Sequence, residues 1–361
     1  MVDPILISPK GLYDEMNGSQ GSAVSHSLLG GLFTLTEGDL QGGNFKNSRV
    51  FTWLFRWNFL ASMVHLFSFI FIWARYFSTQ GERSDFRMDG DVTWGGVCWE
   101  FEEGVLSFSN VPERVWDRRD MIFTVVEGFF FLSFLFQAIN GLMVEEYAKR
   151  VQFNGVQFLR FQEYSLSGSL ALVGIALTVQ INDVQTLFYI FFLSYTCMIF
   201  GLVSDNIRAV WRDCWLYRQN CMDKTTPFSA IPAQLRWLMW YTHIVGWVPL
   251  LAVFTCLLIH FLMTANLGWS CLQSLPLGSG SEARSVPDFV IVLVVCTLVL
   301  YSSFGFVHVW QLKRDEKEVP LDGRSVRDAE TGVLIEGLFI FLSLTAKLIL
   351  GFVIASNILF V

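Results

Sequence analysis

Charged residues are scarce in this sequence of 361 residues, where Asp, Glu, Lys and Arg together make up 16%. Typical soluble domains carry about 25% charged residues, so the composition argues against an ordinary soluble enzyme. The net charge of −7 argues against nucleic acid as a partner, because phosphate binding needs clustered Lys and Arg. The seven cysteines lack any CxxC or His/Cys spacing. No metal site is therefore expected, and no disulfide framework can be read from their spacing.

Long apolar stretches are abundant instead: 53% of the residues are hydrophobic, with 35 Phe and 13 Trp. A bilayer core of about 30 Å needs roughly 20 apolar residues for each helix. Seven apolar windows, separated by polar segments, cover residues 50–76, 121–144, 156–181, 186–203, 237–267, 289–311 and 337–361. In lipid the backbone must satisfy its own hydrogen bonds, so these windows are expected to be helices. The sequence predicts an all-α membrane protein with seven transmembrane helices among membrane lipids.

The first 48 residues differ from the rest of the chain. They are rich in Gly and Ser and have no apolar core of the length that a signal peptide requires. We expect no signal peptide there, but a flexible cytoplasmic tail over 1–48 with a short helix near 27–34. Residues 49–361 then form a single seven-helix domain.

Basic residues are distributed unevenly over the segments that connect the windows. If the N-terminus is cytoplasmic, 15 of the 25 Lys and Arg residues fall on the cytoplasmic side, seven on the other side and three within windows. Cytoplasmic loops of membrane proteins carry an excess of basic residues. The sequence therefore predicts a cytoplasmic N-terminus and an extracellular or luminal C-terminus.

Segment 77–118, the long first extracellular loop in this topology, contains an alternating pattern. Its apolar residues lie on either side of a Gly-Gly pair in VTWGGVCWEF, which begins at Val92. This pattern is typical of a β-hairpin, so we predict a small hairpin that turns at Gly95-Gly96. Cys98 lies in this loop and Cys271 in a later outside loop. Their distance cannot be judged from sequence, which leaves open a disulfide or two unpaired thiols.

Lys347 is the most informative residue, because it is the only charged residue in the last apolar window. It lies 10 residues after Gly337 and 14 before Val361, which places it near the middle of the membrane. A lysine at this depth costs about 2.5–3.5 kcal/mol on insertion scales. Snorkelling is the alternative, but it suits helix ends. Burial favours the neutral amine, a competent nucleophile toward an aldehyde, so Lys347 is a candidate functional residue.

A buried lysine needs an acidic partner. Glu163 is the deepest acid in the windows and is therefore the predicted counterion. Arg160, three residues earlier on the same helix face, could pair with Glu163 instead. Glu127 is expected toward the outside and Glu336 toward the cytoplasm, the latter about 16 Å from Lys347 along the helix axis.

Ser343 lies four residues before Lys347 and so on the same helix face. Its hydroxyl could bond a protonated nitrogen at Lys347 or its own helix carbonyl, and spacing alone favours the carbonyl.

Several windows contain stretches that resemble the heliorhodopsin family. LSLTAKLILGF, around Lys347, is similar to the family's retinal-lysine segment, and RFQEYSLSGS, around Glu163, is similar to its counterion segment. RWNFLASMVH resembles the first helix and ends at His65. VPDFVIVLVVCTLVLYSSFGF and VGWVP are weaker matches in the sixth and fifth windows. Together these stretches cover about 50–355.

The resemblance implies a rhodopsin-like, retinal-binding bundle with all-trans retinal held as a Schiff base on Lys347. Glu163 would be its counterion and Ser343 its hydrogen-bonding neighbour. A homodimer, an inverted topology and a β-structured outside loop are also implied, and residue patterns predict the last two independently. By analogy, the residues that line the retinal are Met198, Gly201, Gly246, Pro249, Tyr301, Phe304 and Phe352. Plain packing is the alternative for each aromatic residue among them.

The sequence departs from the family pattern at two points. The family's partner for His65 is a second histidine, whereas Gln137 stands at the matching position and cannot take up a proton. Pro249 is followed by Leu250 rather than by Trp. The residues that we predict for a proton relay are His65, Gln137, Glu127 and Glu336.

The function expected from these patterns is light sensing. Segment 205–236, with five basic residues, is the predicted docking surface for a cytoplasmic signalling partner. A light-gated or light-driven proton or ion transporter is the alternative, because acids at three depths could conduct protons. A retinal-free transporter or lipid-handling protein is a third reading. Enzymatic activity is not expected, since no nucleophile–base or metal constellation occurs in the windows.

Overall fold

A computed structural model describes residues 49–79, 91–102, 105–152, 156–221, 231–264, 288–317 and 326–359. The predicted tail and its short helix lie outside these residues. Within them, six single helices are long and apolar enough to cross a membrane. They are α3 (Arg49–Thr79), α4 (Arg118–Leu142), α8 (Val184–Cys221), α9 (Ile231–Thr264), α10 (Asp288–Lys317) and α11 (Val326–Ile354).

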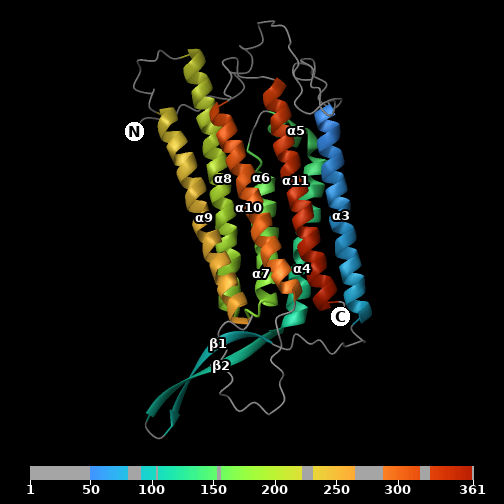
Figure 1. Ribbon diagram of the computed structural model, residues 1–361, viewed down its shortest axis with the longest axis vertical. Helices are drawn as coiled ribbons and strands as arrows, with labels where there is room; N and C mark the ends of the chain where they lie inside the picture. The colour runs from blue at the N-terminus through green and yellow to red at the C-terminus, as the bar shows by residue number, and fades with distance from the viewer. Residues whose placement is uncertain are drawn as a thin grey trace.

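The seventh span is a helix built from three consecutive pieces. α6 (Phe158–Glu163), the π-helical turn η2 (Tyr164–Gly168) and α7 (Ser169–Thr178) follow one another without a gap. At 1.5 Å per residue this composite helix is about 30 Å long, which matches a bilayer core. It runs alongside the other six helices (Figure 1), and the predicted seven-helix architecture is confirmed.

The composite helix forms the centre of the bundle. All but one of the residues of α7 are buried, as expected for a helix that is apolar on every face. The outer helices instead present large apolar side chains outward, among them Phe67, Phe188 and Val248, each more than half exposed. A surface of this kind suits contact with lipid rather than water.

A two-stranded antiparallel sheet extends from one end of the bundle (Figure 1). It pairs β1 (Asp91–Glu102) with β2 (Val105–Asp117), so the predicted hairpin is confirmed. The predicted position of the hairpin turn was wrong. Gly95 and Gly96 lie inside β1 and pair with Pro112 and Val111. The strands are 12 and 13 residues long, so their pairing carries the ladder well past the Gly-Gly pair.

The hairpin is fixed to the bundle by the connection between α7 and α8. The backbone N–H of Thr93 donates to the carbonyl of Asn182 at 3.0 Å. The next residue, Asp183, accepts from the backbone N–H and the hydroxyl of Thr186 in the first turn of α8. Helix α8 therefore begins at the hairpin end of the bundle, and α9 begins at the opposite end, which we call the hairpin-distal end.

The prediction that segment 205–236 is a loop was wrong for residues 205–221 and 231–236, which are helical; residues 222–230 lie outside the described part of the chain. Helix α8 continues to Cys221, and α9 begins at Ile231. The apolar window stopped at 203 because of Asp205 and Arg208, but these two side chains are fully buried and form an ion pair at 2.7 Å. Their charges compensate each other, so the helix stays within the bundle and Arg208 is not available to a docking partner.

Two short helices complete the described fold. α5 (Val144–Gln152) follows α4 at the hairpin-distal end, and the π-helical turn η5 (Ala355–Leu359) ends the described part of the chain. In Figure 1, α3 begins at the hairpin-distal end and α11 ends at the hairpin end. The two ends of the helical domain therefore lie on opposite sides of the bundle.

Candidate functional site: a lysine–glutamate pair at an apolar cavity

Lys347 and Glu163 form a buried ion pair between α11 and the composite helix. The Nζ atom of Lys347 lies 2.6 Å from Oε1 of Glu163. The two residues are 5% and 1% exposed, so water cannot screen their charges. A buried pair of this kind persists only if good geometry and further hydrogen bonds offset the cost of desolvation.

The carboxylate of Glu163 receives those further hydrogen bonds from two other side chains. Gln137 of α4 donates from Nε2 to Oε2 at 2.9 Å. Ser343, one turn before Lys347 on α11, donates from Oγ to Oε1 at 3.3 Å. Hydrogen bonds that involve a charged group are stronger than neutral ones, so three donors from two helices hold this carboxylate in place. The hydroxyl of Ser343 therefore reaches the carboxylate rather than its own helix carbonyl.

The π-helical turn directly follows Glu163. Ser167 donates its hydroxyl to the Glu163 carbonyl at 2.6 Å, and Tyr301 of α10 donates its hydroxyl to the carbonyl of Gly168. Side chains thus satisfy carbonyls in the region where the regular α-helical bonding pattern changes. π-Helical turns within α-helices frequently occur at functional sites, and this one shifts the register of the residues after Glu163.

A second buried ion pair separates Arg160 from Glu163. Arg160 Nη1 pairs with Oε2 of Glu336 on α11, and both side chains are 4% exposed. The hydroxyl of Tyr147 on α5 donates to Oε1 of Glu336 at 2.5 Å. Burial, and next the Glu336 carboxylate, raise the pKa of Tyr147 well above its ordinary value, so this hydroxyl keeps its proton. The pairing of Arg160 with Glu336 leaves Glu163 to Lys347.

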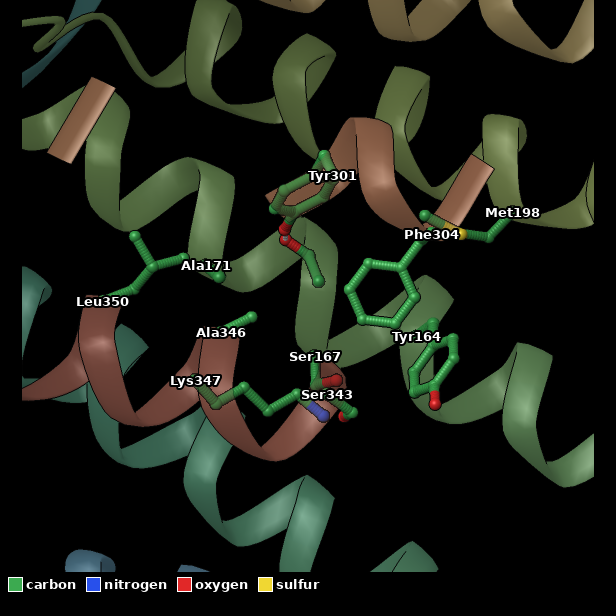
Figure 2. A pocket seen from close by; sticks show the side chains of 11 residues that line it. Tyr164, Ser167, Ala171, Met198, Tyr301, Phe304, Ser343, Ala346, Lys347 and Leu350 are labelled. Atoms are coloured by element: carbon green, nitrogen blue, oxygen red, sulfur yellow. Dashed lines mark hydrogen bonds between the residues drawn. The ribbon is translucent and has the colours of Figure 1, made fainter. Parts of the chain in front are cut away.

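A small cavity lies beside the Lys347–Glu163 pair (Figure 2). Lys347 and Ser343 form part of its wall, and Figure 2 shows the Lys347 amine close to the Ser343 hydroxyl. The other lining residues come from the composite helix, α8, α10 and α11, and most are apolar or aromatic: Tyr164, Ser167, Gly168, Ala171, Met198, Tyr301, Phe304, Ala346 and Leu350.

Comparison with known proteins identifies the family. The sequence profile of the family described as Heliorhodopsin matches residues 54–359, which is most of the chain. The chain belongs to the heliorhodopsin family. No curated protein matches the chain. Membership in the heliorhodopsin family implies a light-responsive membrane protein with a retinal chromophore.

The chemical character of the residues around the cavity suits a retinal molecule. Retinal is an apolar polyene that ends in an aldehyde, and it needs an apolar channel closed at one end by an amine. Ala171, Met198 and Leu350 supply apolar wall, and Lys347 supplies the amine. The Lys347 Nζ also lies 5.5 Å from the centre of the Tyr164 ring, a distance at which an aromatic face stabilises a cation.

Three of the residues predicted to line the retinal of a heliorhodopsin are lining residues of this cavity: Met198, Tyr301 and Phe304. Gly201, Gly246, Pro249 and Phe352 are not among its lining residues in the described part of the chain. Gly201 faces Phe161, and Gly246 faces Phe200. The Phe352 ring lies 6.1 Å from that of Phe71 and 6.3 Å from that of Phe130, between α3 and α4.

Sequence reasoning missed several lining residues that helical spacing could have found. Ser167 and Ala171 follow Glu163 at intervals of four residues, and Leu350 follows Lys347 by three. Side chains at these intervals lie on one helix face. Gly168 was also missed, and the hydroxyl of Tyr301 would lie only 3.3 Å from a Cβ atom there.

The residues of the predicted proton relay are not joined to one another. Gln137 bonds Glu163, and Glu336 bonds Arg160 and Tyr147. Among the residues that the structure describes, neither ring nitrogen of His65 and neither carboxylate oxygen of Glu127 has a hydrogen-bond partner. Both residues are buried.

Within the described ranges, no group of three His, Cys, Asp or Glu residues could hold a metal ion. Residue 271 and the side chain of Cys98 lie outside what is described, so the pairing of Cys98 with Cys271 stays a prediction.

Proposed function

We propose that the protein is a light sensor that holds all-trans retinal as a Schiff base on Lys347, with Glu163 as the counterion. The observation that carries this proposal is the buried Lys347–Glu163 pair at the wall of an apolar cavity. Family membership supports retinal in general. The pair adds an attachment point and a compensating charge at the same place.

Retinal, when bound, supplies absorption of visible light and a light-driven change of shape. The chain's own residues then control one proton at Nζ of Lys347. Glu163 stabilises the protonated nitrogen by Coulomb attraction at 2.6 Å, which is strong where water is excluded. Ser343 and Gln137 donate to Glu163 and fix the direction of its two oxygens.

A proton that leaves Nζ needs an acceptor. Glu163 is the group in direct contact with Nζ. His65 is a second candidate, because its ring is fully buried and neither nitrogen is hydrogen-bonded within the described residues. Gln137 can orient Glu163 but cannot bind the proton itself.

The arrangement of acids favours a sensor over a conductor. A proton path across the bundle needs acids that are free to exchange protons at successive depths. Glu336 is instead held by Arg160 and Tyr147. In the described part of the chain, no hydrogen bond joins any two of Glu127, Glu163 and Glu336.

We place the N-terminus in the cytoplasm, from the excess of basic residues on that side. The homodimer and the signalling partner remain predictions.

Two measurements on the full-length protein test this function. Purified protein given all-trans retinal should develop a visible absorption band, and voltage-clamped cells expressing it should show no sustained photocurrent. A sustained current alongside the band would favour light-driven or light-gated transport. Absence of a band would favour a retinal-free transporter or lipid-handling protein.

A further inference from the structure

Two histidines from neighbouring helices meet in the hairpin-distal half of the bundle. Nδ1 of His243 on α9 lies 3.1 Å from Nδ1 of His308 on α10. The residues are 7% and 6% exposed. Neither histidine lines the cavity beside Lys347, although His308 lies one turn from the cavity residue Phe304.

The hydrogen bonds around the pair fix where its protons lie. The Trp247 indole N–H can only donate, and it donates to Nε2 of His243 at 3.2 Å. The Nε2 atom of His243 therefore carries no proton, and its ring proton is on Nδ1. That N–H donates to Nδ1 of His308, so His308 carries its own proton on Nε2. Both rings are neutral in this arrangement.

An added proton can bind at only two ring nitrogens of the pair, and binding at either one breaks a hydrogen bond. At Nδ1 of His308 it would set two N–H groups against each other at 3.1 Å. At Nε2 of His243 it would oppose the Trp247 N–H at 3.2 Å. We propose that the His243–His308 pair is a proton-binding site whose occupation separates α9 from α10 in the hairpin-distal half of the bundle.

Packing next to the pair makes the α9–α10 contact sensitive to its hydrogen bonds. The Trp247 indole lies against Gly305 so closely that a Cβ atom there would come within 2.1 Å of it. The Trp247 and Phe306 rings lie 6.4 Å apart. The Trp247 ring that donates to His243 therefore also packs against α10. A change in either hydrogen bond would alter the contact between α9 and α10.

Burial opposes the added proton most strongly, and charged groups from the helices around the pair modify that cost. Asp205 on α8 attracts it, whereas Arg208 on α8 and Arg160 on α6 repel it. Gln311 of α10 donates to Oδ1 of Asp205 at 3.3 Å. Within the described residues, Oδ2 of Asp205 and Nε2 of His308 have no hydrogen-bond partner. The carboxylate therefore keeps some capacity to stabilise a cation at His308.

Nuclear magnetic resonance of ¹⁵N-labelled histidine and tryptophan tests the proton site in the full-length protein in lipid nanodiscs, without retinal. His243→Gln and His308→Gln assign the two ring signals. At neutral pH we expect one ring protonated on Nδ1 and one on Nε2. On acidification both rings and the Trp247 indole should change in one step at a common pH. Two independent titrations, or none before circular dichroism shows loss of helix, would overturn the proposal.

A distance measurement tests the coupling to the helices. Spin labels replace Trp237 on α9 and Trp310 on α10, which are 65% and 42% exposed. They are introduced as non-natural amino acids, because the chain has seven cysteines. The distance should increase below the transition pH in the otherwise unchanged protein and in the control His260→Gln. It should not change in the double variant His243→Gln/His308→Gln, which keeps a hydrogen-bonding side chain at each position but has neither ring nitrogen to bind the proton. A constant distance in the unchanged protein, or the same increase in the double variant, would refute the coupling.

Discussion

Lys347 and Glu163 are 184 positions apart in the sequence, yet their side chains meet at 2.6 Å in the middle of the bundle. Each charge makes the other tolerable, because an isolated ion in this setting would cost several kcal/mol. The pair also defines one wall of the apolar cavity through Lys347. This relationship underlies the predictions on pigment formation and colour.

Replacing Lys347 should abolish the pigment without abolishing the fold. Lys347→Arg keeps a cation opposite Glu163 but cannot form a Schiff base, and Lys347→Ala removes both. We expect no visible band from either variant after addition of retinal, with helix content retained in circular dichroism. A normal band in Lys347→Arg would show that the chromophore is attached elsewhere.

Glu163→Gln should change the colour strongly. The ionised carboxylate stabilises a protonated nitrogen at short range, so without it the linkage should lose its proton at a lower pH. At neutral pH the absorption should move to the near ultraviolet, and added halide should restore part of the visible band. Glu127→Gln and Glu336→Gln are the controls and should keep the original spectrum. The opposite result, loss of the band in Glu127→Gln alone, would make Glu127 the counterion.

The lining of the cavity can be tested by filling it. Ala171→Leu adds bulk to the wall, so it should slow retinal uptake or shift the absorption maximum. Phe352→Leu is the matched control, because Phe352 packs against Phe71 and Phe130 instead. Spectra recorded during titration with retinal distinguish the two. An effect of Phe352→Leu equal to that of Ala171→Leu would place retinal in a different cavity.

The Arg160–Glu336 pair is predicted to support stability rather than colour. Glu336→Gln leaves the buried Arg160 charge without its partner, and breaking such a pair typically costs about 3–5 kcal/mol. The melting temperature should fall while the visible band stays in place. The double variant Arg160→Met/Glu336→Leu should recover much of the loss. If thermal melting shows the double variant to be as unstable as Glu336→Gln, an uncompensated charge is not the cause.

The membrane orientation is a separate prediction. A tag on the N-terminus should be protected from outside reagents in intact cells, because basic residues favour the cytoplasmic side. A tag after Val361 should be exposed. Permeabilised cells provide the control, in which both tags should react. The reverse pattern in intact cells would mean that the basic residues do not determine the orientation.

The sequence was most informative where a charged residue lies within an apolar window. A lysine within an apolar window has few explanations, and the depth of Glu163 singled out one partner for it. The same rule fails at Asp205 and Arg208, whose charges end an apolar window although both residues lie inside a helix. Nothing in a hydropathy profile shows that two charges three residues apart will neutralise each other inside the bundle.

Contacts between helices were harder to predict than the helices themselves. Phe352 and Gly201 lie in helices that contribute to the cavity, but they face away from it, because the rotation of each helix depends on its neighbours. The π-helical turn after Glu163 shifts the register of the following helical residues, and no residue type in YSLSG predicts this shift. The His243–His308 contact likewise depends on how α9 and α10 meet, and the two residues are 65 positions apart.

The site of retinal attachment is the most direct test of the proposed function. The pigment is formed with all-trans retinal, the linkage is fixed by borohydride reduction, and the peptides are analysed by mass spectrometry. The account predicts a retinyl group on the peptide that contains Lys347, with loss of that product in Lys347→Arg. A visible pigment whose retinyl group is found on another lysine, or on no peptide at all, would contradict it.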